Sequence, residues 1–139
     1  MKKIYNFLKN HINVILRIAL GSVFLFAGVA KIIHPGAFFQ NIRNILDIVS
    51  DLPYSYAFAI GYVVVGIEII LGLLVLISKN KNVLYASMML ITLFCFILIY
   101  KIATHDTTTC GCYGTFIIVS NQRELVNNVL LLAIAYYLL

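Results

Sequence analysis

The chain has 139 residues, of which 63% are hydrophobic and 11% are charged, and its mean hydropathy is +1.01. Soluble domains average about 25% charged residues, so this composition excludes a water-soluble domain and predicts one integral membrane domain over residues 1–139. The formal net charge of +5 does not indicate nucleic-acid binding, because the basic residues are spread along the chain and form no stripe.

The first predicted span covers residues 12–33, which reach about 33 Å as a helix and can cross a bilayer. It is longer than the apolar segment of a signal peptide, and we expect it to be retained. Glycines permit close helix contact and intramembrane charges point into a bundle, so its polar face is predicted to contact another helix. This face carries Arg17, Gly21, Phe24, Gly28 and Lys31.

A short amphipathic helix in the membrane interface is predicted over residues 37–50, after the break at Pro35. Its apolar side carries Phe38, Ile42, Ile45 and Val49, opposite Gln40, Asn44 and Asp47.

The second predicted span covers residues 54–77 and holds one carboxylate, Glu68, on a face of small residues. Counted from the presumed cytoplasmic ends, Glu68 lies about 13 Å deep and Arg17 about 8 Å deep. A long arginine side chain can cover that difference, so an Arg17–Glu68 pair is predicted. Lys31 is the less favoured partner, because it lies near the opposite surface and can snorkel there.

The third predicted span covers residues 83–103 and forms a hairpin with the second; it holds Cys95 and Lys101. Cys95 is predicted to be a buried thiol that packs as a small hydrophobe. The fourth predicted span covers residues 122–139, about 27 Å of helix. Residues 121–124 resemble a capping box, in which Glu124 reaches back to the start of the helix.

Basic residues predict the topology, because they gather before the first span and between the second and third spans. This charge bias places both termini in the cytoplasm and the loops of residues 34–53 and 104–121 outside. The basic residues concerned are Lys2, Lys3, Lys9, Lys79 and Lys81.

The loop of residues 104–121 holds Cys110 and Cys112, separated by Gly111. Thiols outside the cytoplasm tend to be oxidised, and a disulfide across one residue closes a small, strained and therefore labile ring. We predict thiol–disulfide exchange here; the alternatives are two reduced cysteines, a structural bridge, or a metal site with His105. Zinc usually needs about four ligands at wider cysteine spacing, which disfavours metal.

The intramembrane polar residues Arg17, Lys31 and Glu68 form either a proton or substrate site or an interhelical pair that fixes register. A quinone pocket is an alternative to core and lipid contacts for five aromatic residues, and quinone is accordingly the one cofactor considered. These are Phe24, Phe26, Phe94, Phe96 and Tyr100.

Three parts of the sequence together resemble the DoxX/MauE family of four-helix membrane proteins, and the cysteine loop resembles its MauE-like branch. The parts are Arg17 to Pro35 with the Phe26-Ala27-Gly28 run and Lys31, Glu68 with Gly72, and Cys110-Gly111-Cys112-Tyr113-Gly114. The resemblance implies a redox-associated protein of the bacterial inner membrane with thioredoxin-like partners. It implies a redox role for Cys110 and Cys112, and site or packing roles for Arg17, Lys31 and Glu68. The loop itself is expected to be shaped by Gly111, Tyr113 and Gly114, since glycines ease a tight turn.

The sequence therefore predicts an all-α membrane four-helix bundle that exchanges disulfides with thioredoxin-like or secreted partners. The alternative is a non-catalytic membrane subunit, or a small-molecule or quinone-binding protein, with its site at Arg17, Lys31 and Glu68. The plan is also similar in outline to quinone-linked disulfide-generating enzymes, but this chain lacks their two-residue-spaced cysteine pair.

Overall fold

The fold is known from a computed structural model, which describes residues 2–49, 53–104, 111–115 and 119–139. The helical fold class is confirmed, and one short strand that the sequence did not predict lies in the loop before the last helix. In chain order the elements are α1 (Lys2–Ile33), α2 (Gly36–Val49), α3 (Tyr54–Ile77), α4 (Lys81–Ala103), β1 (Cys112–Thr115) and α5 (Asn121–Leu138).

Within the described residues, three helices are long and apolar enough to cross a membrane: Phe7–Ile33, Tyr54–Ile77 and Lys81–Ala103. The predicted fourth span forms α5, but its first two turns are rich in amide and charged side chains, which lowers its mean hydropathy. Its crossing of the bilayer therefore stays a prediction.

Glycines bring α1 and α3 into backbone contact, as the small-residue faces of both spans predict. A Cβ atom added to Gly21 would lie 2.9 Å from the Gly72 carbonyl oxygen, and one added to Gly72 would lie 3.0 Å from the Gly21 carbonyl oxygen. At Gly28, an added Cβ would lie 2.6 Å from the Ile69 side chain. Larger residues at these positions would push the helices apart.

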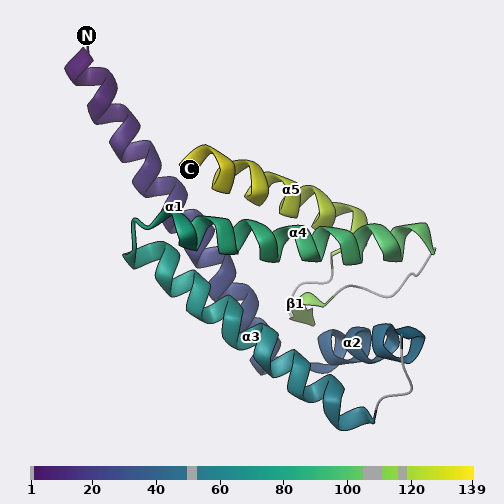
Figure 1. Cartoon of the computed structure of the whole chain (residues 1–139). Coiled ribbons are helices and arrows are strands. Elements are labelled where there is room, and N and C mark those ends of the chain that lie inside the picture. Colours follow the sequence, from purple (N-terminus) through teal and green to yellow (C-terminus); the bar gives the residue numbers. More distant parts are fainter. Residues whose placement is uncertain (1, 50–52, 105–110, 116–118) are drawn as a thin grey trace.

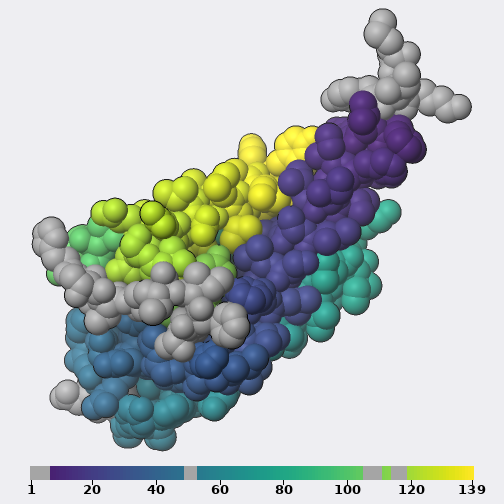
Figure 2. Space-filling model, turned by 180° about the vertical axis from the view of Figure 1, so that it is seen from behind, coloured from purple at the N-terminus to yellow at the C-terminus, as the bar shows by residue number. Residues whose placement is uncertain are grey.

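The helices form two packed pairs, α1 with α3 and α4 with α5, and β1 lies between the second pair and α2 (Figure 1). One apolar core joins the long helices, while the N-terminal end of α1 extends beyond them (Figures 1 and 2). The core consists of Leu20, Phe24, Val75, Leu84, Ile91 and Ala135.

Helix α2 packs on α3 through Phe38 and Phe39, which are buried with Val65 in a second apolar cluster. The ring of Phe39 occupies the space that a side chain at position 61 would need, since Gly61 lies directly against it. The opposite side, including Gln40 and Asp47, is exposed. The helix therefore has a buried apolar face and an exposed polar face. Its place in the membrane interface stays a prediction.

Candidate functional site

A buried ion pair joins α1 to α3: Lys31 Nζ lies 2.5 Å from Glu68 Oε1, and each residue is 1% exposed. The aromatic rings of Phe38 and Phe94 also face the ammonium group, both with their centroids 4.9 Å from Nζ. An isolated charge at this depth is very unfavourable, whereas two opposite charges in contact neutralise each other. Lys31 and Glu68 are therefore stable here only as a pair.

The predicted Arg17–Glu68 pair is wrong. Arg17 Nη1 instead donates a hydrogen bond to the carbonyl oxygen of Ser78, 2.7 Å away, at the C-terminal end of α3. A cation there interacts favourably with the free carbonyl groups and the helix dipole. The depth estimate failed because it set Ile12 level with the C-terminal end of α3, whereas Arg17 itself lies beside Ser78 at that end and Lys31 reaches Glu68.

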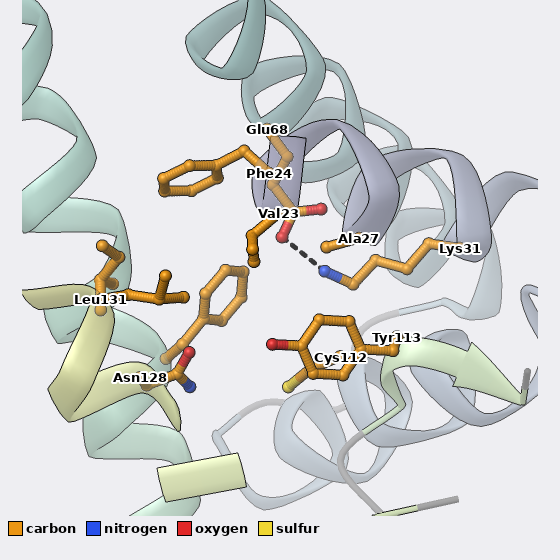
Figure 3. Close-up of a pocket in the computed structure, with 11 residues that line it drawn as sticks. Val23, Phe24, Ala27, Lys31, Glu68, Cys112, Tyr113, Asn128 and Leu131 are labelled. Carbon is orange, nitrogen blue, oxygen red and sulfur yellow. Dashed lines mark hydrogen bonds and ion pairs between the residues drawn. The ribbon is translucent and has the colours of Figure 1, made fainter. Parts of the chain in front are cut away.

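A small cavity of about 30 Å³ lies beside the ion pair, enough for a water molecule. Figure 3 shows the Lys31 amine bonded to the Glu68 carboxylate on one side of it, with Tyr113 and Cys112 across from them. The second carboxylate oxygen, Glu68 Oε2, makes no hydrogen bond within the described part of the chain. The lining residues are Val23, Phe24, Ala27, Lys31, Glu68, Ile91, Phe94, Cys112, Tyr113, Asn128 and Leu131.

Cys112 is disulfide-bonded, 8% exposed and part of the cavity wall. Cys110 and His105, which the sequence placed in the exchange and metal hypotheses, lie outside the described residues. Cys95 is a free thiol that packs against the apolar core, as predicted, but it is partly exposed and not fully buried.

Position 111 requires glycine for two reasons, its backbone conformation and the close contact with α2. Its φ of +68° lies in the left-handed region, which a side chain disfavours. An added Cβ would also lie 2.6 Å from the Phe38 backbone nitrogen, at the start of α2. The described part of the cysteine loop is therefore a turn that is buried at Gly111 and Cys112, followed by β1, which contains Gly114.

Tyr113 extends from β1 to the cavity and is half-buried, with its ring centroid 6.3 Å from that of Phe26. Burial raises the pKa of the Tyr113 phenol, and the negative charges of Glu124 and Glu68 raise it further. The phenol is therefore neutral at physiological pH, so its hydroxyl group can donate a proton in a hydrogen bond.

Sequence reasoning missed a second buried polar group. Lys101 Nζ donates a hydrogen bond to Asn41 Oδ1 at 2.6 Å, which joins α4 to α2. On α5, Glu124 is 2% exposed and Asn128 is 8% exposed, and Glu124 interacts electrostatically with Lys31 and Lys101. The four-residue spacing of Glu124 and Asn128 puts both on one helix face and was the available signal.

The predicted capping box at residues 121–124 is wrong. The N-cap is Ser120, which makes no side-chain cap hydrogen bond, and the Glu124 backbone nitrogen donates to the Ser120 carbonyl oxygen at 3.1 Å. The Glu124 side chain is buried in the bundle, and its Oε2 atom makes no hydrogen bond among the described residues.

The five aromatic residues proposed for a quinone pocket do not share one site. Phe24 and Phe94 line the cavity, whereas Phe26, Phe96 and Tyr100 are 44%, 66% and 47% exposed. The exposed rings suit contact with lipid.

These features define the class of the molecule: a multi-pass helical membrane protein with a buried ion pair and a disulfide-bonded cysteine on one small cavity. The model of the family described as "Methylamine utilisation protein MauE" matches residues 9–139, and the chain belongs to this family. The match confirms the resemblance to MauE-like proteins. No curated protein and no solved structure matches the chain.

Proposed function

We propose that the protein is an inner-membrane thiol–disulfide exchange component that uses a Cys110–Cys112 disulfide. The observation that carries this proposal is the disulfide-bonded state of Cys112 beside a cavity with a buried ion pair. Of the three cysteines in the sequence, Cys95 is a free thiol, so we assign Cys110 as the partner of Cys112. The family description names a process, methylamine utilisation, but no chemical step. The support for a disulfide-exchange mechanism therefore comes from the site.

Burial suggests which sulfur reacts with the partner protein. An attacking thiolate must reach the sulfur atom that it attacks in line with the S–S bond. Cys112 is only 8% exposed, which hinders this approach. We therefore assign the attacked sulfur to Cys110. A partner thiolate bonds to this sulfur, the Cys110–Cys112 bond breaks, and Cys112 leaves with the electron pair and takes a proton. The partner's second thiolate then attacks the mixed disulfide and releases Cys110.

The overall reaction converts a partner dithiol and the loop disulfide into a partner disulfide and a loop dithiol, with two electrons and two protons transferred. The reverse reaction delivers a disulfide to the partner. We propose a thioredoxin-like protein as the partner, since such proteins carry the required pair of cysteines.

The basic residues support a topology in which the loop faces the extracytoplasmic side and both termini are cytoplasmic. In this arrangement α5 is the fourth span, after the three long apolar helices. An impermeant thiol reagent applied to reduced cells tests it: labelling of Cys110 in intact cells is expected, and labelling only after the membrane is opened contradicts the proposed orientation.

Cysteine variants test the exchange itself. The Cys112→Ser variant is mixed with a thioredoxin-like protein whose second cysteine is replaced by serine and whose first cysteine is held as a mixed disulfide with a small thiol. Cys110 should displace the small thiol, and the mixed disulfide between the two proteins should accumulate because neither protein keeps a second thiol to resolve it, as seen by non-reducing electrophoresis and mass measurement. The matched Cys110→Ser variant should accumulate much less, because Cys112 is buried. Absence of mixed disulfide in both variants, together with no exchange by the wild-type protein, contradicts the proposed function.

The alternative, a non-catalytic subunit or a quinone-binding or other small-molecule protein, receives less support from the geometry. Arg17 bonds to the end of α3 and does not reach Glu68, so the three polar residues form no common site. The cavity of about 30 Å³ accepts water and is too small for a quinone ring.

A further inference from the structure

We propose that the Lys31–Glu68 pair carries the proton of Cys112: Glu68 accepts this proton through Oε2 when Cys112 attacks a mixed disulfide, and Lys31 stabilises the thiolate that forms. This inference rests on the proposed function and assigns a role to two residues that hold no sulfur. Glu68 is the proton acceptor, and Lys31 is a positioning residue that also supplies positive charge.

The shared cavity supports the inference. Lys31, Glu68 and Cys112 all line it, and Figure 3 shows the ion pair across the cavity from Cys112 and Tyr113. The available volume of about 30 Å³ admits a water molecule, and a general base can act through one water. A water molecule in this cavity would give a route for proton transfer between Cys112 and Glu68.

The hydrogen-bonding of the carboxylate supports it independently. Glu68 is 1% exposed, and one of its oxygens, Oε1, is bonded to Lys31. Its other oxygen, Oε2, has no hydrogen-bond partner among the described residues. A buried acceptor without a partner is normally unfavourable, which makes an unpaired carboxylate oxygen a candidate for a chemical role.

The charge balance explains why both residues are needed. Before transfer the cavity holds the Lys31 ammonium, the Glu68 carboxylate and the neutral Cys112 thiol. After transfer it holds the ammonium, a neutral carboxylic acid and the thiolate. The S–H bond breaks, an O–H bond forms, and the total charge of the site stays at zero during the transfer. When the thiolate forms the new disulfide, the expelled thiolate takes up a proton and Glu68 releases its own, through water, so the carboxylate is restored beside the Lys31 ammonium.

Other titratable groups around the pair do not replace Glu68. Tyr113 faces the cavity from β1, but its pKa is raised, so at neutral pH its phenol carries a proton and cannot accept one. Helix α2 contributes the Phe38 ring. Lys101 on α4 and Glu124 on α5 interact with each other, and Glu124 also interacts with Lys31, but neither lines the cavity.

The test follows the resolution of a glutathione mixed disulfide in the reduced, purified protein. Oxidised glutathione reacts with Cys110, and attack by Cys112 then releases glutathione at a measurable rate. The double variant Lys31→Met with Glu68→Gln keeps the cavity neutral, so it is expected to fold. At pH 7 it should resolve the mixed disulfide about tenfold or more slowly, because general base catalysis is lost.

The pH profile separates a proton-transfer role from a structural one. Without an internal acceptor, resolution should follow the thiolate fraction of Cys112, which changes about tenfold per pH unit below the thiol pKa. The wild-type rate should change less steeply. The matched control, Lys101→Met with Asn41→Leu, removes the other buried polar pair and should keep the wild-type profile.

Three results would overturn the inference. One is a folded Lys31→Met, Glu68→Gln protein, verified by its unfolding temperature in detergent, with the wild-type rate and pH slope. The second is an equal loss in the Lys101→Met, Asn41→Leu control. The third is a tenfold loss in Tyr113→Phe alone, which would assign the proton to the phenol. Failure of the proposed function is distinct, because it is the absence of exchange with a thioredoxin-like protein while glutathione still reacts.

Discussion

Two buried lysines near the ends of α1 and α4 have different kinds of partner. Lys31 forms an ion pair with Glu68 and lines the cavity beside Cys112, whereas Lys101 donates a hydrogen bond to the amide of Asn41 and interacts electrostatically with Glu124. Both are almost fully buried, at 1% and 4% exposed. The difference teaches that burial alone does not indicate chemistry: both lysines join two helices, but Lys31 lines the cavity beside Cys112 and Lys101 does not.

The largest expected effect comes from leaving one charge of the ion pair unpaired. Glu68→Leu leaves the Lys31 ammonium buried without its carboxylate, which should lower the free energy of unfolding by about 3–5 kcal/mol. Thermal or denaturant unfolding in detergent measures this change. Adding Lys31→Met to the same protein should restore most of the loss; a double variant as unstable as the single one would show that the two charges do not depend on each other.

A smaller loss is expected at the turn before β1. Gly111→Ala places a Cβ atom in a left-handed conformation and 2.6 Å from the Phe38 backbone nitrogen. Strain of this kind costs about 1–3 kcal/mol. Gly36→Ala is the matched control, because an added Cβ meets nothing within 4 Å there. Equal unfolding temperatures for the two variants would contradict the close packing of Gly111 on α2.

Asn41→Leu tests the second lysine directly. It removes the 2.6 Å acceptor of Lys101 and should reduce the free energy of unfolding by about 1–2 kcal/mol, the cost of a lost hydrogen bond to a buried group. If the two lysines differ as described, this loss of unfolding free energy is smaller than the loss for Glu68→Leu measured under the same conditions. Resolution of the glutathione mixed disulfide is then also unchanged.

The smallest expected effect is at Arg17. Arg17→Met removes one partly buried hydrogen bond to the end of α3 and should cost about 1 kcal/mol, without changing the rate of disulfide exchange. Parallel unfolding and exchange measurements on the same preparation check both values. A large loss of exchange would instead place Arg17 in the redox site.

The helices were predictable from the sequence because apolar runs, proline and glycine mark their limits. Pro35 and Pro53 separate α2 from its neighbours, and the face with Gly21 and Gly28 was correctly expected to contact another helix. These are local signals, which depend on residues within a few turns.

The contacts between elements were less predictable because they depend on how far one helix is shifted along its neighbour. Glu68 had two candidate partners on α1, and the position of α1 along α3, with Arg17 beside Ser78, decided in favour of Lys31. A shift of one residue had a similar effect on α5: with Ser120 as N-cap, Glu124 is a core residue and not a capping residue. No local pattern indicates that Gly111 packs on α2, since that contact joins distant parts of the chain.

The contact of Gly21 with Gly72 has a consequence for how the protein fits its bilayer. Sliding α1 along α3 by one helical turn, about 5.4 Å, would bring Arg17 or Leu25 into the place of Gly21, where even a single Cβ atom would lie 2.9 Å from the Gly72 carbonyl oxygen. The two helices therefore cannot adjust their combined length by sliding. In a thicker or thinner membrane the pair must respond to hydrophobic mismatch by tilting as a unit, with Lys31 and Glu68 still in contact.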